Sequence, residues 1–297
     1  MNTTLKDGRS VAQEEIGSTA GNPPQRKPGD QEEMSPEPQV VPEAFRPAGK
    51  LEGRRALITG GDSGIGRSVA VMFAMEGADV AIVYDKSDDD AAETARLVRA
   101  QGRRCLLLKG DVGVESFCRE AISQTTKELG GLNILVNNAA EQHPQKSIQD
   151  ITEDQLVRTF RTNIFGYFFM VKHALDHLKE GDSIINTGSV TAFKGSEELL
   201  DYSATKGAIS SFTRSLAEHL KDRKIRVNTV APGPVWTPLI PSTFGKEKLK
   251  QFGKDTLWER PAHPGEIAAT YVMLASDDGL FYSGQTFHPN GGTVVAS

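Results

Sequence analysis

From Arg54 to the end of the chain, short apolar runs alternate with longer stretches in which apolar residues recur every three or four positions. The short runs are bounded by Gly, Asp or Asn and predict strands, and the longer stretches predict helices. This alternation is typical of a parallel sheet with helices on both faces, so we expect one doubly wound α/β domain over residues 51–297. The seven predicted strands are 56–59, 80–83, 105–108, 134–136, 183–186, 226–230 and 285–288. The predicted helices are 68–76, 89–101, 116–129, 154–178, 204–221 and 264–275.

The first 50 residues differ in character from the rest. They have few large apolar side chains, and prolines recur among Glu, Gln, Ser and Gly at Pro23, Pro24, Pro28, Pro36, Pro38, Pro42 and Pro47. Such a segment cannot offset its ordering entropy by burial. We therefore expect an extended or largely disordered arm over residues 1–50, with 42–47 laid against the domain. Both a partner-binding tail and an arm that packs on its own oligomer fit this composition.

Composition narrows the range of functions. A formal net charge of −5 and a pI near 5.8 give no long-range attraction for nucleic acid or an anionic membrane. There is no run of about 18 apolar residues, and the N-terminus lacks the layout of a secretory signal, so the predicted compartment is the cytoplasm.

Cysteine and histidine spacing predicts no metal site. Cys105 and Cys118 fall in a predicted strand and helix without a CxxC or Cys/His pattern, and we expect reduced core residues. The histidines on predicted helices or surface turns show no ligand spacing and are His173, His177, His219 and His263.

A glycine-rich turn, Thr59-Gly-Gly-Asp-Ser-Gly-Ile-Gly66, follows the first predicted strand and precedes a predicted helix. Its glycines permit a tight turn and a close backbone approach, and the helix offers unpaired N–H groups to a diphosphate. A plain strand-to-helix turn is the alternative. We predict a dinucleotide site with contacts from Gly60, Asp62, Ser63, Gly64, Ile65 and Gly66.

A tyrosine and a lysine lie four residues apart in Asp201-Tyr-Ser-Ala-Thr-Lys-Gly207, downstream of Ser189. Residues i and i+4 share a helix face, so the Lys206 ammonium can lie beneath the Tyr202 phenol and favour its ionised form. A phenol with an ordinary pKa of about 10 then becomes an acid or base near neutral pH. A solvated helix pair is the alternative for these two residues taken alone.

Taken together, the TGxxxGxG turn, Asn137-Asn-Ala-Ala140, Ser189, Tyr202 and Lys206 resemble the classical short-chain dehydrogenase/reductase family over residues 51–297. The stretches TGGDSGIGR, AEQHP and PGPVWTPLIP are similar to its bacterial general-stress-type oxidoreductases. The resemblance implies a Rossmann-type fold, an NAD(P)-dependent oxidoreductase acting on a small alcohol or carbonyl substrate, and a homo-oligomer. A tetramer is expected, with residues 204–221 in its interface.

The resemblance also implies catalytic roles. Tyr202 would give or take the proton, Lys206 would lower the pKa of the phenol and bind the nicotinamide ribose, and Ser189 would hold the substrate oxygen. Asn163 would connect Lys206 to a water chain. Two alternatives stay open, because Ser189 could cap a strand end and Asn163 could make only local hydrogen bonds.

The remaining cofactor contacts follow the strand ends. Asp85, after Tyr84, can accept hydrogen bonds from an adenosine ribose and would repel a 2′-phosphate, which favours NAD over NADP. Members of the family that use NAD usually place this acid at Tyr84, and nearby Lys86 and Arg67 leave NADP open. The other predicted contacts, by resemblance, are Asp111, Val112, Asn138, Ala139, Ala140, Pro232, Gly233, Val235 and Thr237, together with Tyr202 and Lys206.

Three further expectations concern the surroundings of the site. Ala140 replaces the family's usual glycine, so we expect an ordinary backbone conformation there. His143 is either a loop residue or a proton relay. The amphipathic segment 238–260 should form a short helical lid over the nicotinamide end. The alternative function is a dinucleotide-binding sensor or scaffold without turnover.

Overall fold

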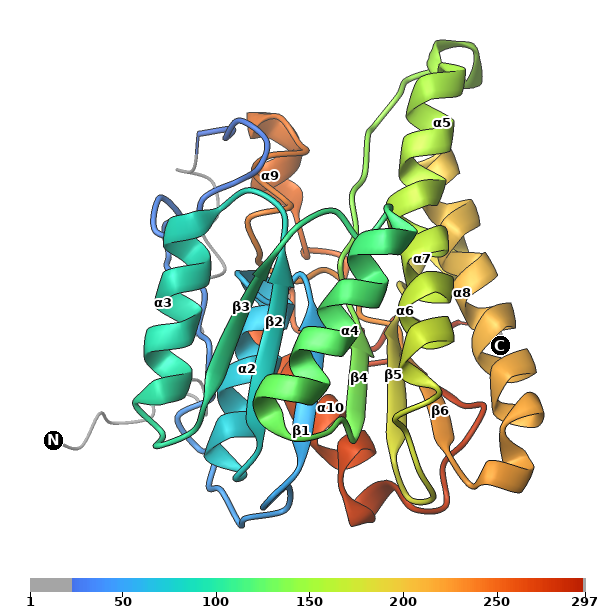
Figure 1. The fold of residues 1–297 in the computed structure, drawn as a ribbon. Coiled ribbons are helices and arrows are strands. Elements are labelled where there is room, and N and C mark those ends of the chain that lie inside the picture. The colour runs from blue at the N-terminus through green and yellow to red at the C-terminus, as the bar shows by residue number, and fades with distance from the viewer. Residues whose placement is uncertain (1–22, 296–297) are drawn as a thin grey trace, which may run out of the picture.

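The structure, a computed structural model, describes residues 23–295. Its seven strands pair in parallel in one sheet of order β3-β2-β1-β4-β5-β6-β7 (Figure 1), which confirms the predicted doubly wound fold. Winding reverses between β1 and β4, the point at which α/β sheets bind ligands. The strands are β1 Arg55–Thr59, β2 Asp79–Tyr84, β3 Cys105–Lys109, β4 Ile134–Asn137, β5 Ser183–Thr187, β6 Arg226–Val230 and β7 Thr286–Phe287.

Helices cover both faces of the sheet because its strands are apolar on both sides. The helices are α2 Gly64–Met75, α3 Asp88–Arg99, α4 Glu115–Leu129, α5 Glu153–Phe160, α6 Gly166–Ala174, α7 Thr191–Lys194, α8 Leu200–His219, α9 Lys246–Gln251 and α10 Pro264–Ala275. Successive residues of β1 point to opposite faces, so Ile58 belongs to the core formed with α2, α3 and α10, whereas Leu57 belongs to the core formed with α4, α6 and α8.

Three predicted helices differ from those observed by four or more residues at one end. The helix predicted from 68 begins at Gly64. The expected helix 154–178 is interrupted by a π-helical turn, Arg161–Phe165, and ends at Ala174. The helix predicted from 204 begins at Leu200. Its first turn contains Asp201, whose Oδ1 accepts a hydrogen bond of 2.8 Å from the Tyr202 N–H, so an N–H group of the first turn is satisfied.

The described part of the arm, residues 23–50, has no helix or strand and lies against the domain over more than the expected 42–47. Met34 is buried beside Trp236, whose indole N–H donates to the Pro36 carbonyl oxygen at 2.8 Å. Gln39 N–H donates to His263 Nδ1 at 3.0 Å. The expectation for residues 1–22 lies outside the described part of the chain.

His263 was expected on a helix or surface turn. It lies at the start of α10 but is buried, and its Nδ1 accepts the hydrogen bond from the arm. Cys105 and Cys118 are buried free thiols, as predicted, and burial raises their pKa values to about 11 and about 12. No helix within residues 23–295 is long and apolar enough to cross a membrane.

Segment 238–260 contains one short helix, α9, and packs by its apolar side chains. Ile240, Phe244 and Leu249 are buried together with Tyr202, whereas Leu257 and Trp258 are exposed. The segment therefore forms a side wall of a cavity next to Tyr202.

Candidate active site

A cavity of about 930 Å³ opens at the carboxyl ends of the central strands. Its size is suited to a cofactor together with a small substrate. Every residue predicted for the site lines this cavity except Gly66 and Asn163. Gly66 lies behind the glycine loop and Asn163 lies beneath the catalytic end.

The glycine loop is closely fitted to its neighbours. Gly60 and Gly64 have φ of 62° and 53°, which favour glycine. A β-carbon on Gly66 would lie 1.9 Å from the Gly60 carbonyl oxygen. Asn138 Nδ2 donates to the carbonyl oxygens of Thr59 and Gly60, each at 3.1 Å. This cradle at the N-terminus of α2 fits the diphosphate of a dinucleotide.

Acidic groups dominate the end of β2, where an adenosine ribose would lie. Tyr84 ends the strand, and its hydroxyl donates to Asp88 at 2.9 Å. Asp85 follows, and its nearest cation is the exposed Lys86 at 3.4 Å. Asp62, from the glycine loop, lies within their electrostatic reach, and burial raises its pKa to about 6.

Arg67 does not extend into this part of the cavity. It is buried and paired with Asp90 at 2.5 Å, and its Nε donates to the Asp62 carbonyl oxygen and to Thr94. Its guanidinium thus connects α2 to α3 through Asp90 and Thr94.

Two loop positions of the site have clear local geometry. Asp111 Oδ1 accepts from the Gly113 N–H at 2.7 Å, before α4 begins at Glu115, so it closes a local turn. Ala140 does not have a positive φ, since the positive-φ residues other than glycine in the described chain are Lys224 and Glu259. The ordinary backbone expected at Ala140 is confirmed.

The loop after β6 is fixed from both sides. Val190 N–H donates to the Pro232 carbonyl oxygen at 2.9 Å, and Val235 bridges to Ala262 in a parallel pair. A β-carbon on Gly233 would lie 2.7 Å from the Asn290 carbonyl oxygen. The loop thus holds a defined position along the cavity wall.

Tyr202 and Lys206 lie on the first turns of α8 and are both buried. Lys206 Nζ donates to the Thr187 carbonyl oxygen at 2.8 Å and lies 5.3 Å from the centroid of the Tyr202 ring. Burial lowers the pKa of Lys206 to about 7. Burial also raises the pKa of Tyr202 to about 12, despite an opposing hydrogen bond from Ser189. Burial thus opposes the lowering of the phenol pKa that the i, i+4 spacing predicts.

Asn163 sits in the π-helical turn and joins two elements that flank the catalytic end. Its Oδ1 accepts from the Glu141 N–H at 2.9 Å, and its Nδ2 donates to the Glu141 carbonyl oxygen and to Thr205 Oγ1, at 3.0 and 3.1 Å. Thr205 precedes Lys206, so Asn163 fixes the loop after β4 against α8. π-turns are frequent at functional sites.

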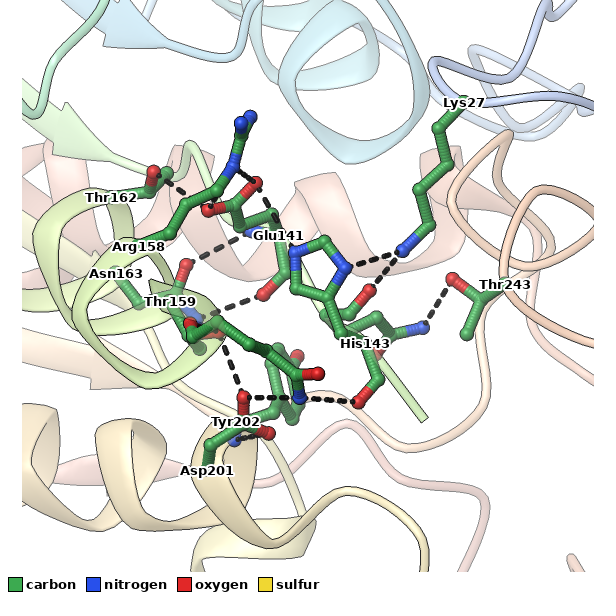
Figure 2. Close-up of polar contacts among 12 residues, drawn as sticks. Lys27, Glu141, His143, Arg158, Thr159, Thr162, Asn163, Asp201, Tyr202 and Thr243 are labelled. Carbon is green, nitrogen blue, oxygen red and sulfur yellow. Dashed lines mark hydrogen bonds and ion pairs between the residues drawn. The ribbon is translucent and has the colours of Figure 1, made fainter. Parts of the chain in front are cut away.

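Several polar residues of the site were not found from the sequence. Asp201 Oδ2 accepts from Gln155 and Thr159 of α5, at 3.0 and 2.8 Å, and so positions the turn that carries Tyr202. Figure 2 shows a second network, in which Glu141 pairs with Arg158 at 2.9 Å and lies 3.5 Å from His143. Nothing in the local sequence marks the contacts of Asp201 with α5 or of Glu141 with Arg158, since these partners lie on different elements.

The fold and this geometry define a class of dinucleotide-dependent oxidoreductases. A family described as enoyl-(acyl carrier protein) reductase matches residues 60–294. A short-chain dehydrogenase from Burkholderia cenocepacia, solved in complex with NADP, superposes with a TM-score of 0.77 at 32% identity, covering 82% of this chain and 98% of that one. The chain belongs to the short-chain dehydrogenase/reductase family.

Within that family the similarity is more specific. General stress protein 39 of Bacillus subtilis is 55% identical over 92% of this chain and 95% of its own length. Glucose and ribitol dehydrogenase of Daucus carota is 51% identical, over 92% and 97%. NADPH-dependent aldehyde reductase 1, chloroplastic, of Arabidopsis thaliana is 48% identical, over 91% and 96%. The predicted family and its general-stress-type subgroup are confirmed.

Among residues 23–295, no group of three or more His, Cys, Asp or Glu side chains could hold a metal ion. The prediction that catalysis uses no metal stays a prediction.

Proposed function

We propose that this oxidoreductase interconverts a small alcohol and its carbonyl compound, with Tyr202 as the general acid and base. A bound nicotinamide supplies or accepts the hydride. Tyr202 gives its proton to the carbonyl oxygen during reduction, and Ser189 donates a hydrogen bond to that oxygen as negative charge develops. Lys206 carries positive charge next to the phenol, Asn163 holds the surrounding loop, and segment 238–260 excludes water from the site.

The observation that carries this proposal is the position of Tyr202, Lys206 and Ser189 on one cavity with the glycine loop. One ligand can therefore reach the diphosphate cradle at one end and the buried phenol at the other. The names of the relatives suggest sugar alcohols and aldehydes as substrates.

The test is the absorbance change at about 340 nm with polyols, sugars, and aliphatic and aromatic aldehydes, in both directions. Turnover of one of these classes supports the proposal. Tight dinucleotide binding without turnover of any of them would favour the non-catalytic sensor or scaffold instead.

We propose NAD(H) as the preferred cofactor. Asp85 and Asp62 place carboxylates where a 2′-phosphate would lie, and Arg67 is already neutralised by Asp90. We expect kcat/KM to be at least about tenfold higher with NADH than with NADPH, because like charges in close contact are costly. Use of NADPH has a precedent among similar proteins, because the Burkholderia cenocepacia structure contains NADP. Equal or better use of NADPH would contradict the proposal.

Carbonyl reduction should be fastest below about pH 7 and decline as pH rises. With pKa values of about 12 for Tyr202 and about 7 for Lys206, the phenol keeps its proton across this range, whereas the lysine loses its charge above neutrality. Alcohol oxidation needs the phenol deprotonated and should increase toward alkaline pH. Profiles of kcat/KM in both directions from about pH 5.5 to about 9.5 check this. A reduction rate that increases through neutrality would show that burial does not set these two pKa values.

We propose a homotetramer in the cytoplasm. Apolar side chains on α5, the π-helical turn and α6 are exposed, namely Leu156, Val157, Phe165 and Phe168. Phe168 stacks on Phe212 of α8 with ring centroids 4.1 Å apart. These exposed apolar side chains are suited to burial against a partner copy. Light scattering at several concentrations tests the assembly, and a single monomeric mass would contradict it.

A further inference from the structure

The arm contacts two walls of the dinucleotide cavity directly. Gly29 packs on Pro238, since a β-carbon on Gly29 would lie 2.3 Å from the Pro238 carbonyl oxygen. Gln31 is buried, and its Oε1 accepts a hydrogen bond of 2.8 Å from the N–H of Gly64, the first residue of α2. The arm is thus fixed both to the segment 238–260 and to the glycine loop.

From this position Lys27 extends to the opposite wall, the loop after β4 (Figure 2). Its Nζ donates to the carbonyl oxygen of Gln142 and lies 3.1 Å from His143 Nδ1. His143 Nε2 faces the Glu141 carboxylate at 3.5 Å, so the tautomer protonated at Nε2 presents Nδ1 to the lysine as an acceptor. An ammonium has three N–H donors, and this arrangement uses two of them. The third is available to a ligand in the cavity, which Lys27 lines.

Lys27 differs from the other lysines on the cavity in its charge environment. Among residues 23–295, no carboxylate oxygen lies within 4.0 Å of its Nζ. The three other solvent-exposed lysines that line the cavity are each paired: Lys86 with Asp85, Lys194 with Asp255, and Lys248 with Glu198. Although the Lys27 side chain as a whole is exposed, desolvation of its ammonium lowers its pKa. An incoming oxyanion would stabilise this ammonium.

Two oxyanions could reach this position, the diphosphate of the dinucleotide or an anionic group on the substrate. The backbone contacts favour the diphosphate. Gly29, two residues from Lys27, packs on Pro238, and a β-carbon on Gly64 would lie 3.0 Å from Thr237 and 3.7 Å from Pro238. The arm that carries Lys27 therefore runs next to the N-terminus of α2, where N–H groups favour phosphate, and the side chain crosses from there to the loop after β4.

We propose that Lys27 is a diphosphate-binding residue, contributed by the N-terminal arm to a site whose other phosphate contacts come from the glycine loop. This inference rests on the proposed dinucleotide-dependent function. The Lys27 ammonium covers the diphosphate from the open side of the cavity. It is held in this position by the Gln142 carbonyl oxygen and by His143, which in turn faces Glu141. The arm is then part of the cofactor site and not a separate tail.

Equilibrium binding tests the proposal without turnover. We expect Lys27→Met to raise the Kd for NADH and for ADP-ribose, which keeps the diphosphate but lacks nicotinamide, by about tenfold, the scale of one charge-assisted hydrogen bond. The Kd for adenosine should be unchanged, because adenosine has no phosphate. Lys27→Arg keeps the charge and should stay within about threefold of the native Kd.

Lys50→Met is the matched control, since it removes the same charge from the same arm at an exposed position outside the cavity, and it should bind like the native protein. Thermal unfolding confirms that each variant is folded. An unchanged Kd for NADH and ADP-ribose in Lys27→Met would overturn the proposal. If KM for phosphorylated or carboxylated substrates alone then rose, the oxyanion would belong to the substrate. Because the readout is binding, either result is distinct from a failure of the proposed catalysis.

Discussion

Tyr202→Phe is expected to lower kcat by at least about 100-fold while changing the dinucleotide Kd by less than about threefold. The substitution removes only the hydroxyl that gives or takes the proton, and the ring can keep its place in the buried cluster with Trp236 and Ile240. The Lys206 ammonium also keeps its hydrogen bond to the Thr187 carbonyl oxygen, so the charge at this end of the cavity is retained. Steady-state kinetics and a dinucleotide titration on the same preparation separate the two effects.

Tyr282→Phe is a suitable control for this loss. It removes the same hydroxyl from a tyrosine that does not line the cavity, and the edge contact of its ring with Phe287 remains. We expect native kcat. If Tyr202→Phe kept more than about a tenth of native turnover while folded, another group would be the proton donor and the proposed mechanism would be wrong.

The fold could be predicted because each strand carries its own signal. In β1 the buried residues alternate between two cores, and the glycine turn follows directly, so sheet type and switch point can both be derived from local patterns. The π-helical turn had no such signal. Its shape depends on Asn163 bonding Glu141 and Thr205, which come from distant parts of the chain.

The path of the arm was not predictable for a related reason. Its composition indicates only how much it can bury on its own, whereas Met34 is buried against residues about 200 positions away, such as Trp236. The lysine that it brings to the cavity meets partners more than 100 residues away in sequence. A segment can thus look disordered in sequence and still be ordered by a surface that the rest of the chain builds.

The charge state of Tyr202 shows a third limit. Helical spacing predicts that Lys206 lies on the same face as Tyr202, and it does, but the ammonium lies over the ring and both groups are buried. Burial penalises the charged form of each, so it raises one pKa and lowers the other. The spacing of the two residues predicts that they lie close together. The desolvation that disfavours their charged forms can be seen only in the packed structure.

Gly66→Ala is expected to weaken dinucleotide binding by at least about tenfold and to destabilise the fold by about 1–3 kcal/mol, the usual cost of overpacking. The added methyl group would lie 1.9 Å from the Gly60 carbonyl oxygen and 2.9 Å from Asn138 Nδ2. The oxygen belongs to the backbone, so relief requires the start of α2 to move away from the loop. That movement displaces the N–H groups that would bind the diphosphate, and small displacements of such groups are costly.

Gly207→Ala makes the same chemical change in the middle of α8, where an added β-carbon meets nothing within 4 Å. Alanine is the better helix former by about 0.5–1 kcal/mol, so this control should be slightly more stable and should bind dinucleotide normally. Thermal unfolding and NADH titration of both variants form the test. Native affinity in Gly66→Ala would mean that the loop and α2 can separate without loss of the diphosphate site. The close packing of Gly66 behind the loop would then not determine the geometry of the diphosphate site.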